Sequence, residues 1–177
     1  ATAVATGRYT FTGSITNPLV SGGANITATA IGYRTASATP TILVGQTVTQ
    51  NLTLPPTVVV VTVKDGGSVP VPGTVVTFTD SAGRTFTGTT GAGGVVTFTS
   101  TMTTPIAGGS GIVTATPPGG TPVVQTPTIT PGISNPVTIL LDPTVLTGVV
   151  TDTVSALPIP GATVTVTNGG RTYTTTT

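Results

Sequence analysis

The chain has few side chains capable of acid–base, nucleophilic or metal chemistry. It contains no His and no Cys, and its carboxylates are Asp65, Asp80, Asp142 and Asp152, with no Glu. Zinc and thiolate sites and Ser-His-Asp arrangements need residues that are absent, and most general acid–base catalysis lacks its usual groups. We therefore expect no catalytic residue, no metal site and no cofactor, and a protein that is not an enzyme.

Three short segments resemble fragments of calcium-binding loops. They begin at Asp65, Asp80 and Asn168 and read DGG, DSAG and NGG. Calcium takes six or more oxygens, several of them from carboxylates, and the sequence does not cluster its acids. Asp and Asn also cap turns, in which Gly supplies the left-handed backbone. We predict turns at all three places.

Two sequons for N-glycosylation occur, Asn25-Ile-Thr and Asn51-Leu-Thr. Strand alternation places both Asn side chains on the outward face, where a modified residue must lie, and chance occurrence of so short a pattern is the alternative. Only 5% of the residues are charged and the mean hydropathy is +0.43. Thr hydroxyls, glycans or burial against neighbouring chains must then cover the outward faces.

The charges give no sign of a nucleic-acid or lipid partner. The net charge is +1, and the five basic residues are spread along the chain at Arg8, Arg34, Lys64, Arg84 and Arg171. The longest apolar run, residues 58–61, is far too short to span a bilayer. We expect no nucleic-acid binding and no membrane span.

The composition indicates an all-β protein. Thr and Val are abundant beside 24 Gly and 16 Pro, which favours pleated strands joined by turns and disfavours helices. We predict essentially no helix.

The chain is built from two copies of one repeat. Residues 7–56 run parallel to 93–143, with shared TFT and TAT strings and a closing Leu-rich strand, and 144–177 run parallel to 57–90. Residues 57–143 are then one complete repeat. Residues 1–56 are the last part of a repeat and 144–177 the first part of the next, to be completed by residues equivalent to 1–56 of a neighbouring unit.

Alternation of period two gives the buried face of each strand. About seven short strands per repeat, separated by Gly/Pro turns, predict tandem antiparallel β-sandwiches of the Ig-like or prealbumin-like kind. The expected inward-facing residues are Tyr9, Phe11, Ile26, Ala28, Ala30, Val48, Leu52, Leu54, Val76, Phe78, Phe86, Phe98, Ala162, Val164 and Val166.

The strings GVVTDTVSALPIPGATVTV, GRYTFTGSI and ANITATAIGYRTASATPTILVGQTVTQNLTL carry a family resemblance. They resemble carboxypeptidase regulatory-like domains, which have a transthyretin-like or prealbumin-like β-sandwich and occur in bacterial surface and adhesin repeat proteins. The resemblance covers both repeats and implies a fold rather than an activity.

Adhesin repeats related to this family carry an intramolecular Lys–Asn isopeptide bond, which directs attention to Lys64 and Asn135. The resemblance makes them a candidate pair. Against it, the chain has no Glu, and Thr151 occupies the position of Lys64 in the second copy. A Lys that guards a strand edge is the alternative.

The interrupted repeats predict self-association. A half sandwich exposes strand edges and half of an apolar core, and the prolines at 55–56 and 143 give linkers too stiff for the two ends to meet within one chain. We expect repeats stacked head to tail in an extracellular or cell-surface structural fibre. The chain is then either a subunit joined to the next copy by strand complementation or a repeating segment continuous with neighbouring repeats in a longer polypeptide. The alternatives are a tandem-repeat stalk of a large adhesin and an accessory module of a secreted hydrolase.

Overall fold

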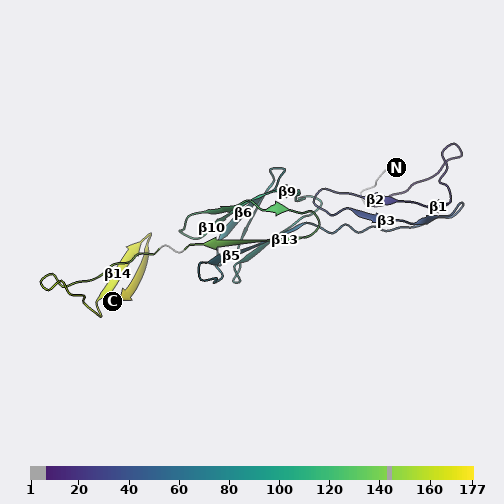
Figure 1. The fold of residues 1–177 in the computed structure, drawn as a ribbon. Helices are drawn as coiled ribbons and strands as arrows, with labels where there is room; N and C mark the ends of the chain where they lie inside the picture. Colours follow the sequence, from purple (N-terminus) through teal and green to yellow (C-terminus); the bar gives the residue numbers. More distant parts are fainter. Residues whose placement is uncertain (1–6, 143–144) are drawn as a thin grey trace.

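The molecule is a row of three parts, each made of strands. The computed structural model describes residues 7–142 and 145–177; residues 1–6 and the predicted boundary at 143–144 lie outside the described residues. Figure 1 shows the amino-terminal segment (residues 7–56), the central sandwich (residues 57–142) and the carboxy-terminal segment (residues 145–177) following one another along the molecule. The described ranges contain strands and no helix, so none long and apolar enough to cross a membrane. The all-β prediction is confirmed.

Two sheets form the central sandwich, ordered β13-β5-β8 and β11-β10-β6-β7, with a separate pair β12-β9 beside them. The bounds of its strands are β5 Val58–Asp65, β6 Val75–Thr79, β7 Thr85–Thr89, β8 Val95–Thr99, β9 Gly109–Ser110, β10 Ile112–Thr116, β11 Val123–Gln125, β12 Thr128–Ile129 and β13 Ser134–Leu141.

Strand β5 is the middle strand of its sheet. It pairs antiparallel with β8 at five positions and parallel with β13 at eight, from Val58 opposite Ser134 to Asp65 opposite Leu141. The other strand pairs of the central sandwich are antiparallel, as predicted. The parallel pair was not predicted, because alternation shows which face a residue takes and not the direction of the neighbouring strand.

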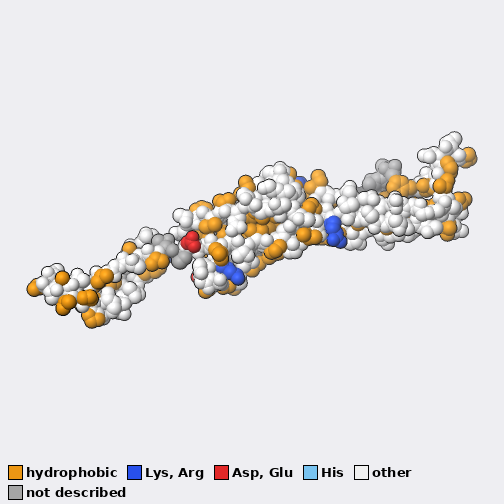
Figure 2. All heavy atoms as spheres, viewed as in Figure 1, with side chains coloured by type: hydrophobic (Ala, Val, Ile, Leu, Met, Phe, Trp, Pro, Cys, Tyr) orange, Lys and Arg blue, Asp and Glu red, His pale blue; other side chains and the backbone are white. Residues whose placement is uncertain are grey.

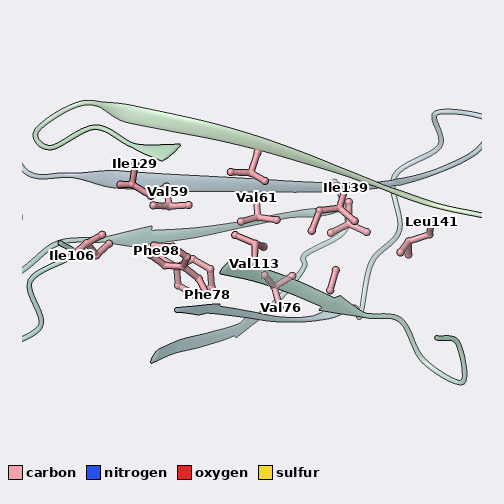
Figure 3. Packing of buried hydrophobic residues seen from close by; sticks show 13 residues of the cluster. Val59, Val61, Val76, Phe78, Phe98, Ile106, Val113, Ile129, Ile139 and Leu141 are labelled. Carbon is pink, nitrogen blue, oxygen red and sulfur yellow. The ribbon is translucent and has the colours of Figure 1, made fainter. Parts of the chain in front are cut away.

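The core lies between these two sheets (Figure 3). Val59, Val61 and Val63 from β5 are fully buried, as period-two alternation requires of every second residue. Phe78 is stacked on Phe86 with ring centroids 5.6 Å apart, and both lie against Phe98. These three aromatic residues occupy the predicted core.

The prediction that Phe11 is a core residue is wrong for the described chain. Its side chain is 59% exposed, whereas that of Phe98, its counterpart in the complete repeat, is 7% exposed. Strand β5 pairs beside Phe98 through Val59. Residue 11 lies in a segment that forms no strand, so nothing equivalent covers it.

The two end segments contain only short pairs. The amino-terminal segment has β1 paired with β4 and β2 paired with β3, and the carboxy-terminal segment has the hairpin β14-β15. Their bounds are β1 Gly22–Gly23, β2 Ile26–Ala28, β3 Ala36–Ala38, β4 Thr41–Ile42, β14 Thr163–Asn168 and β15 Arg171–Thr176.

The amino-terminal segment is fastened to the central sandwich where the two meet. The N–H of Thr57 donates to Gly32 O, and Tyr33 forms an isolated antiparallel bridge with Pro56. A Cβ on Gly32, whose φ is +82°, would overlap the Ser100 hydroxyl and crowd Ile106 N. The close approach of the two parts therefore depends on glycine at this position.

Asp80 ties the turn between β6 and β7 to the loop before β9. Its side chain is fully buried, and the carboxylate accepts hydrogen bonds from Ala82 N, Arg84 N, Arg84 Nε and Ala107 N, at 2.8–3.0 Å. Burial raises the pKa of Asp80, but the N–H of Ala107, the N–H and guanidinium of Arg84 and the N–H of Ala82 together lower it more, and the pKa ends below its ordinary 3.8. The carboxylate thus stabilises the fold in its charged form.

We predict that Asp80→Asn destabilises the central sandwich by about 1–3 kcal/mol at neutral pH, because an amide cannot accept at both former carboxylate oxygens. A lowered folded-state pKa gives stability above the unfolded pKa of about 4, which is lost as the pH falls through the folded value. Denaturant titrations from pH 7 to pH 2 should show a slope below about pH 4 in the parent chain that is smaller in Asp80→Asn. Equal slopes in the two proteins would contradict the assignment.

Candidate functional site

The described residues hold no cluster of three or more groups that could bind a metal ion. Asp65 Oδ1 accepts hydrogen bonds from Gly67 N and Val69 N, both at 2.9 Å. Asp152 Oδ1 accepts from Val154 N, Ser155 N and the Ser155 hydroxyl, and the N–H and hydroxyl of Ser155 and the N–H of Val154 hold the pKa of this carboxyl below its usual range. Asp65 closes a turn, as predicted, and Asn168 pairs with Arg171 across the turn predicted there. Asp152 also closes a turn, which was not predicted from the sequence.

Asn135 is a structural residue between β13 and β5. The residue is buried, and its side-chain Nδ2 donates to Val58 O, Thr130 O and Ile133 O, while its Oδ1 accepts from Thr130 N. In the parallel register Asn135 is opposite Val59 and Lys64 is opposite Leu140. Five residues of strand separate the two positions, about 16 Å, so the structure does not bring the candidate isopeptide pair together.

The two sequon residues are both exposed. Asn25 precedes β2, and Asn51 lies before Pro55 in a segment that forms no strand. Their counterparts in the complete repeat, Ile112 and Thr138, are exposed as well. Completion of the repeat would therefore leave both sequons open to solvent.

The amino-terminal segment repeats strand pairs of the central sandwich. In the amino-terminal segment, Gly22 pairs with Ile42 and Ile26 pairs with Ala38. In the central sandwich Gly109 pairs with Ile129 and Val113 pairs with Gln125. Each pair reproduces the other at a constant offset of 87 residues, so the amino-terminal segment has the register of β9 to β12.

Loop hydrogen bonds repeat at the same offset. Ala24 N donates to Pro40 O as Gly111 N donates to Pro127 O, and Tyr33 N donates to Ala30 O as Gly120 N donates to Pro117 O. The left-handed glycines Gly45 and Gly132 also correspond, with φ of +74° and +70°.

The carboxy-terminal segment has the local structure of residues 57–90. Gly161 N and Ala162 N donate to Thr177 O and Thr177 Oγ1, as Gly73 N and Thr74 N donate to Thr90 O and Thr90 Oγ1. The Thr177 hydroxyl donates to Ile159 O as the Thr90 hydroxyl donates to Val71 O. Hairpin β14-β15 therefore corresponds to β6-β7.

Each end segment lacks the partners that the other contains. In the central sandwich β5 pairs with β8 and β13, and β6 pairs with β10. The counterparts of β5 and β6 are residues 145–152 and β14, in the carboxy-terminal segment. The counterparts of β8, β10 and β13 are residues 8–12, β2 and residues 47–54, in the amino-terminal segment. Residues 8–12, 47–54 and 145–150 form no strand.

Apolar side chains are uncovered at these places. Leu146 is 76% exposed, whereas its counterpart Val59 is fully buried, and Tyr173 is 57% exposed where its counterpart Phe86 packs against the core. In Figure 2 hydrophobic side chains also gather on the two ends of the molecule, beyond the central sandwich. A face of this kind on a soluble protein marks an interaction site.

Both end segments are also hollowed. A hollow of about 500 Å³ is lined by residues that include Phe11, Gly13 and Leu19, whose counterparts Phe98, Ser100 and Ile106 are buried in the central sandwich. A second hollow of about 290 Å³ is lined by residues that include Val150, Pro158 and Ile159. We call the first the amino-terminal hollow and the second the carboxy-terminal hollow.

The central sandwich shows what fits the carboxy-terminal hollow. There, the counterparts of its lining residues, Val63, Pro70 and Val71, surround Gly94, and Val63 N donates to Gly94 O at 2.8 Å. A Cβ on Gly94, whose φ is +69°, would overlap Val63 O. Gly7 is the counterpart of Gly94, has the same φ and has nothing within 4 Å of a Cβ position. Sequence reasoning did not single out Gly7, although comparison of the two copies residue by residue would have done so.

No protein-family model matches the chain, and neither does the sequence of a curated protein. Among solved structures, the TIE protein of Bacillus anthracis is similar at 12% identity with a TM-score of 0.41, over 71% of this chain and 27% of that one. The chain thus spans about a quarter of that protein. The function has to be judged from the geometry of the end segments themselves.

We predict that Asn135→Ala lowers the stability of the chain by about 2–3 kcal/mol, because three main-chain carbonyls and the N–H of Thr130 lose a buried partner. Thermal unfolding followed by circular dichroism measures the loss. The matched change Thr138→Ala, at an exposed position of the same strand, should stay within about 0.5 kcal/mol. If Asn135→Ala melts like the parent chain, Asn135 does not have this structural role.

Proposed function

We propose that the chain is a structural subunit of an extracellular fibre, joined head to tail where the carboxy-terminal segment of one copy completes a sandwich with the amino-terminal segment of the next. The observation that carries the proposal is complementarity in register. The elements left unpaired in one segment are the partners required by the other, and both segments already hold the local hydrogen bonds of the complete repeat.

The central sandwich serves as the template for this joint. With the same register, residues 145–152 would lie between residues 8–12 and 47–54 as β5 lies between β8 and β13. Main-chain hydrogen bonds along both edges of the inserted strand and burial of Leu146 and Phe11 would stabilise the joint. A second copy of the chain is the occupant that matches at every one of these positions.

The chemistry of the surface supports an extracellular setting for the fibre. Charged residues are scarce, and both sequons lie at positions that stay exposed in a completed repeat. Covalent glycans on Asn25 and Asn51 would keep the surface of such a fibre hydrated. The joint is heterologous, since the two surfaces differ, and such contacts propagate rather than close.

Electron microscopy of the purified chain tests the proposal directly. The expected result is long fibres with an axial repeat of two sandwich units, growing with protein concentration. Separate short rods at all concentrations would contradict it. Short rods that contain several units in one covalent chain would instead favour the adhesin stalk, and intact mass distinguishes that case.

We predict that Leu146→Asp abolishes fibre formation, because the joint would bury an unpaired carboxylate at the position of Val59. The isolated chain tolerates the change, since Leu146 is 76% exposed. Val154→Asp is the matched control: Val154 is 93% exposed and its counterpart Gly67 is exposed in the central sandwich. Fibres from Leu146→Asp as abundant as those from Val154→Asp would contradict the proposed joint.

We predict that Gly7→Ala prevents assembly while leaving the central sandwich intact, because an alanine Cβ would overlap the neighbour's Val150 O as a Cβ on Gly94 would overlap Val63 O. Gly83→Ala is the control for backbone strain alone, since Gly83 has φ of +78° and open space around it. Sedimentation velocity should show fibres for Gly83→Ala and single chains for Gly7→Ala. Assembly of both variants would place residue 7 outside the joint.

A further inference from the structure

One layer of the central sandwich contains three valines side by side. Val61 of β5 is directly opposite Val96 of β8 and Val137 of β13. Val61 is fully buried, Val137 is 5% exposed and Val96 packs against the core. Directly opposed residues share a face of the sheet, so the middle strand and both neighbours contribute side chains of equal size to this layer.

The end segments have different residues at the three corresponding positions. The counterpart of Val61 is Gly148, and hydrogen bonds fix this alignment, because Ile159 N donates to Val150 O as Val71 N donates to Val63 O. The counterparts of Val96 and Val137 are Tyr9 and Gln50, each 87 residues earlier in the chain. Compared with the valine layer, the middle position has no side chain and both flanking positions have a larger one.

The Tyr9 side chain already reaches across to the segment that contains Gln50, whose own side-chain amide donates to Asn51 O. The Tyr9 hydroxyl donates to the main-chain O of Gln50, so the Tyr9 side chain spans from residues 8–12 to residues 47–54. In the central sandwich the strand between the two corresponding strands is β5. Tyr9 therefore crosses the slot that an inserted strand would occupy, and it leaves little room there for a further side chain.

Gly148 is free to accept such a neighbour. A Cβ built on Gly148 has nothing within 4 Å, and its φ is outside the left-handed range. Neither backbone conformation nor contacts within the described chain therefore require glycine at this position.

We propose that Gly148 is the specificity-determining residue of the joint, receiving the Tyr9 side chain of the next copy where a valine would collide with it. This inference rests on the proposed function. It selects residues 145–152 as the strand that enters the slot, because a strand with the Val61 pattern of β5 is too bulky beside Tyr9 and Gln50. It equally keeps residues 145–152 out of the central sandwich, where glycine between Val96 and Val137 would leave a cavity.

The test is the critical concentration for fibre formation of full-length variants. Gly148→Val should raise it by about 10- to 100-fold, the effect expected from overpacking one buried layer. Gly93→Val is the matched control, because Gly93 also has open space around it and no left-handed φ. Unfolding of the central sandwich should be unchanged in both variants.

Rescue separates steric collision from any other effect of valine. The triple variant Tyr9→Val, Gln50→Val, Gly148→Val rebuilds the valine layer of the central sandwich and should assemble within about 3-fold of the parent chain. If Gly148→Val assembles like the parent, or if the triple variant remains as defective as Gly148→Val, the inference is overturned while the proposed function stands. If the parent chain forms no fibres while well folded, both are overturned.

Discussion

The structure depends on the need of β5 for a partner along each of its edges. A strand buried within a sheet must satisfy its N–H and C=O groups on both sides, and β5 does so through β8 and β13, with alternate valines fully buried beneath. The chain offers the same three-stranded arrangement a second time, divided between its ends. Because residues 8–12, 47–54 and 145–150 lack the partner strands that their counterparts have, they form no strand. The unsatisfied edges, the exposed Leu146 and Phe11 and the two hollows are consequences of that one missing pairing.

The end segments contain the local strand pairs of the central sandwich but not its long-range pairs. The pairs β1-β4 and β2-β3 and the hairpin β14-β15 keep the register of the central sandwich, because each closes over a few residues with its own turns and glycines. The pairings between residues far apart in sequence are the ones absent from the ends. In the proposed joint, each end segment would associate with its turns already formed, which would lower the conformational entropy lost on ordering the joint.

Much of this architecture could be predicted from the sequence. The repeat, the absence of helix, the turns at Asp65 and Asp80 and the alternating faces follow from local composition and spacing. The parallel pairing of β5 with β13 could not, since it is set by how the chain closes around the core. Nor could the roles of Asn135 and Asp80, because their partners, Val58 O and Ala107 N, are fixed only by the tertiary fold. Tyr9 and Phe11 were predicted to face inward and are exposed, because the covering strand that would bury them is not in the same segment.

The unlikeness of the two end surfaces gives any assembly built from them a direction. One terminus of a growing fibre would display residues 145–152 and the carboxy-terminal hollow, and the other would display the slot that the Tyr9 side chain crosses. Incoming copies would meet different chemistry at the two termini, so elongation rates would differ between them. A cell-bound anchor that matched one surface would thereby set which way every fibre points.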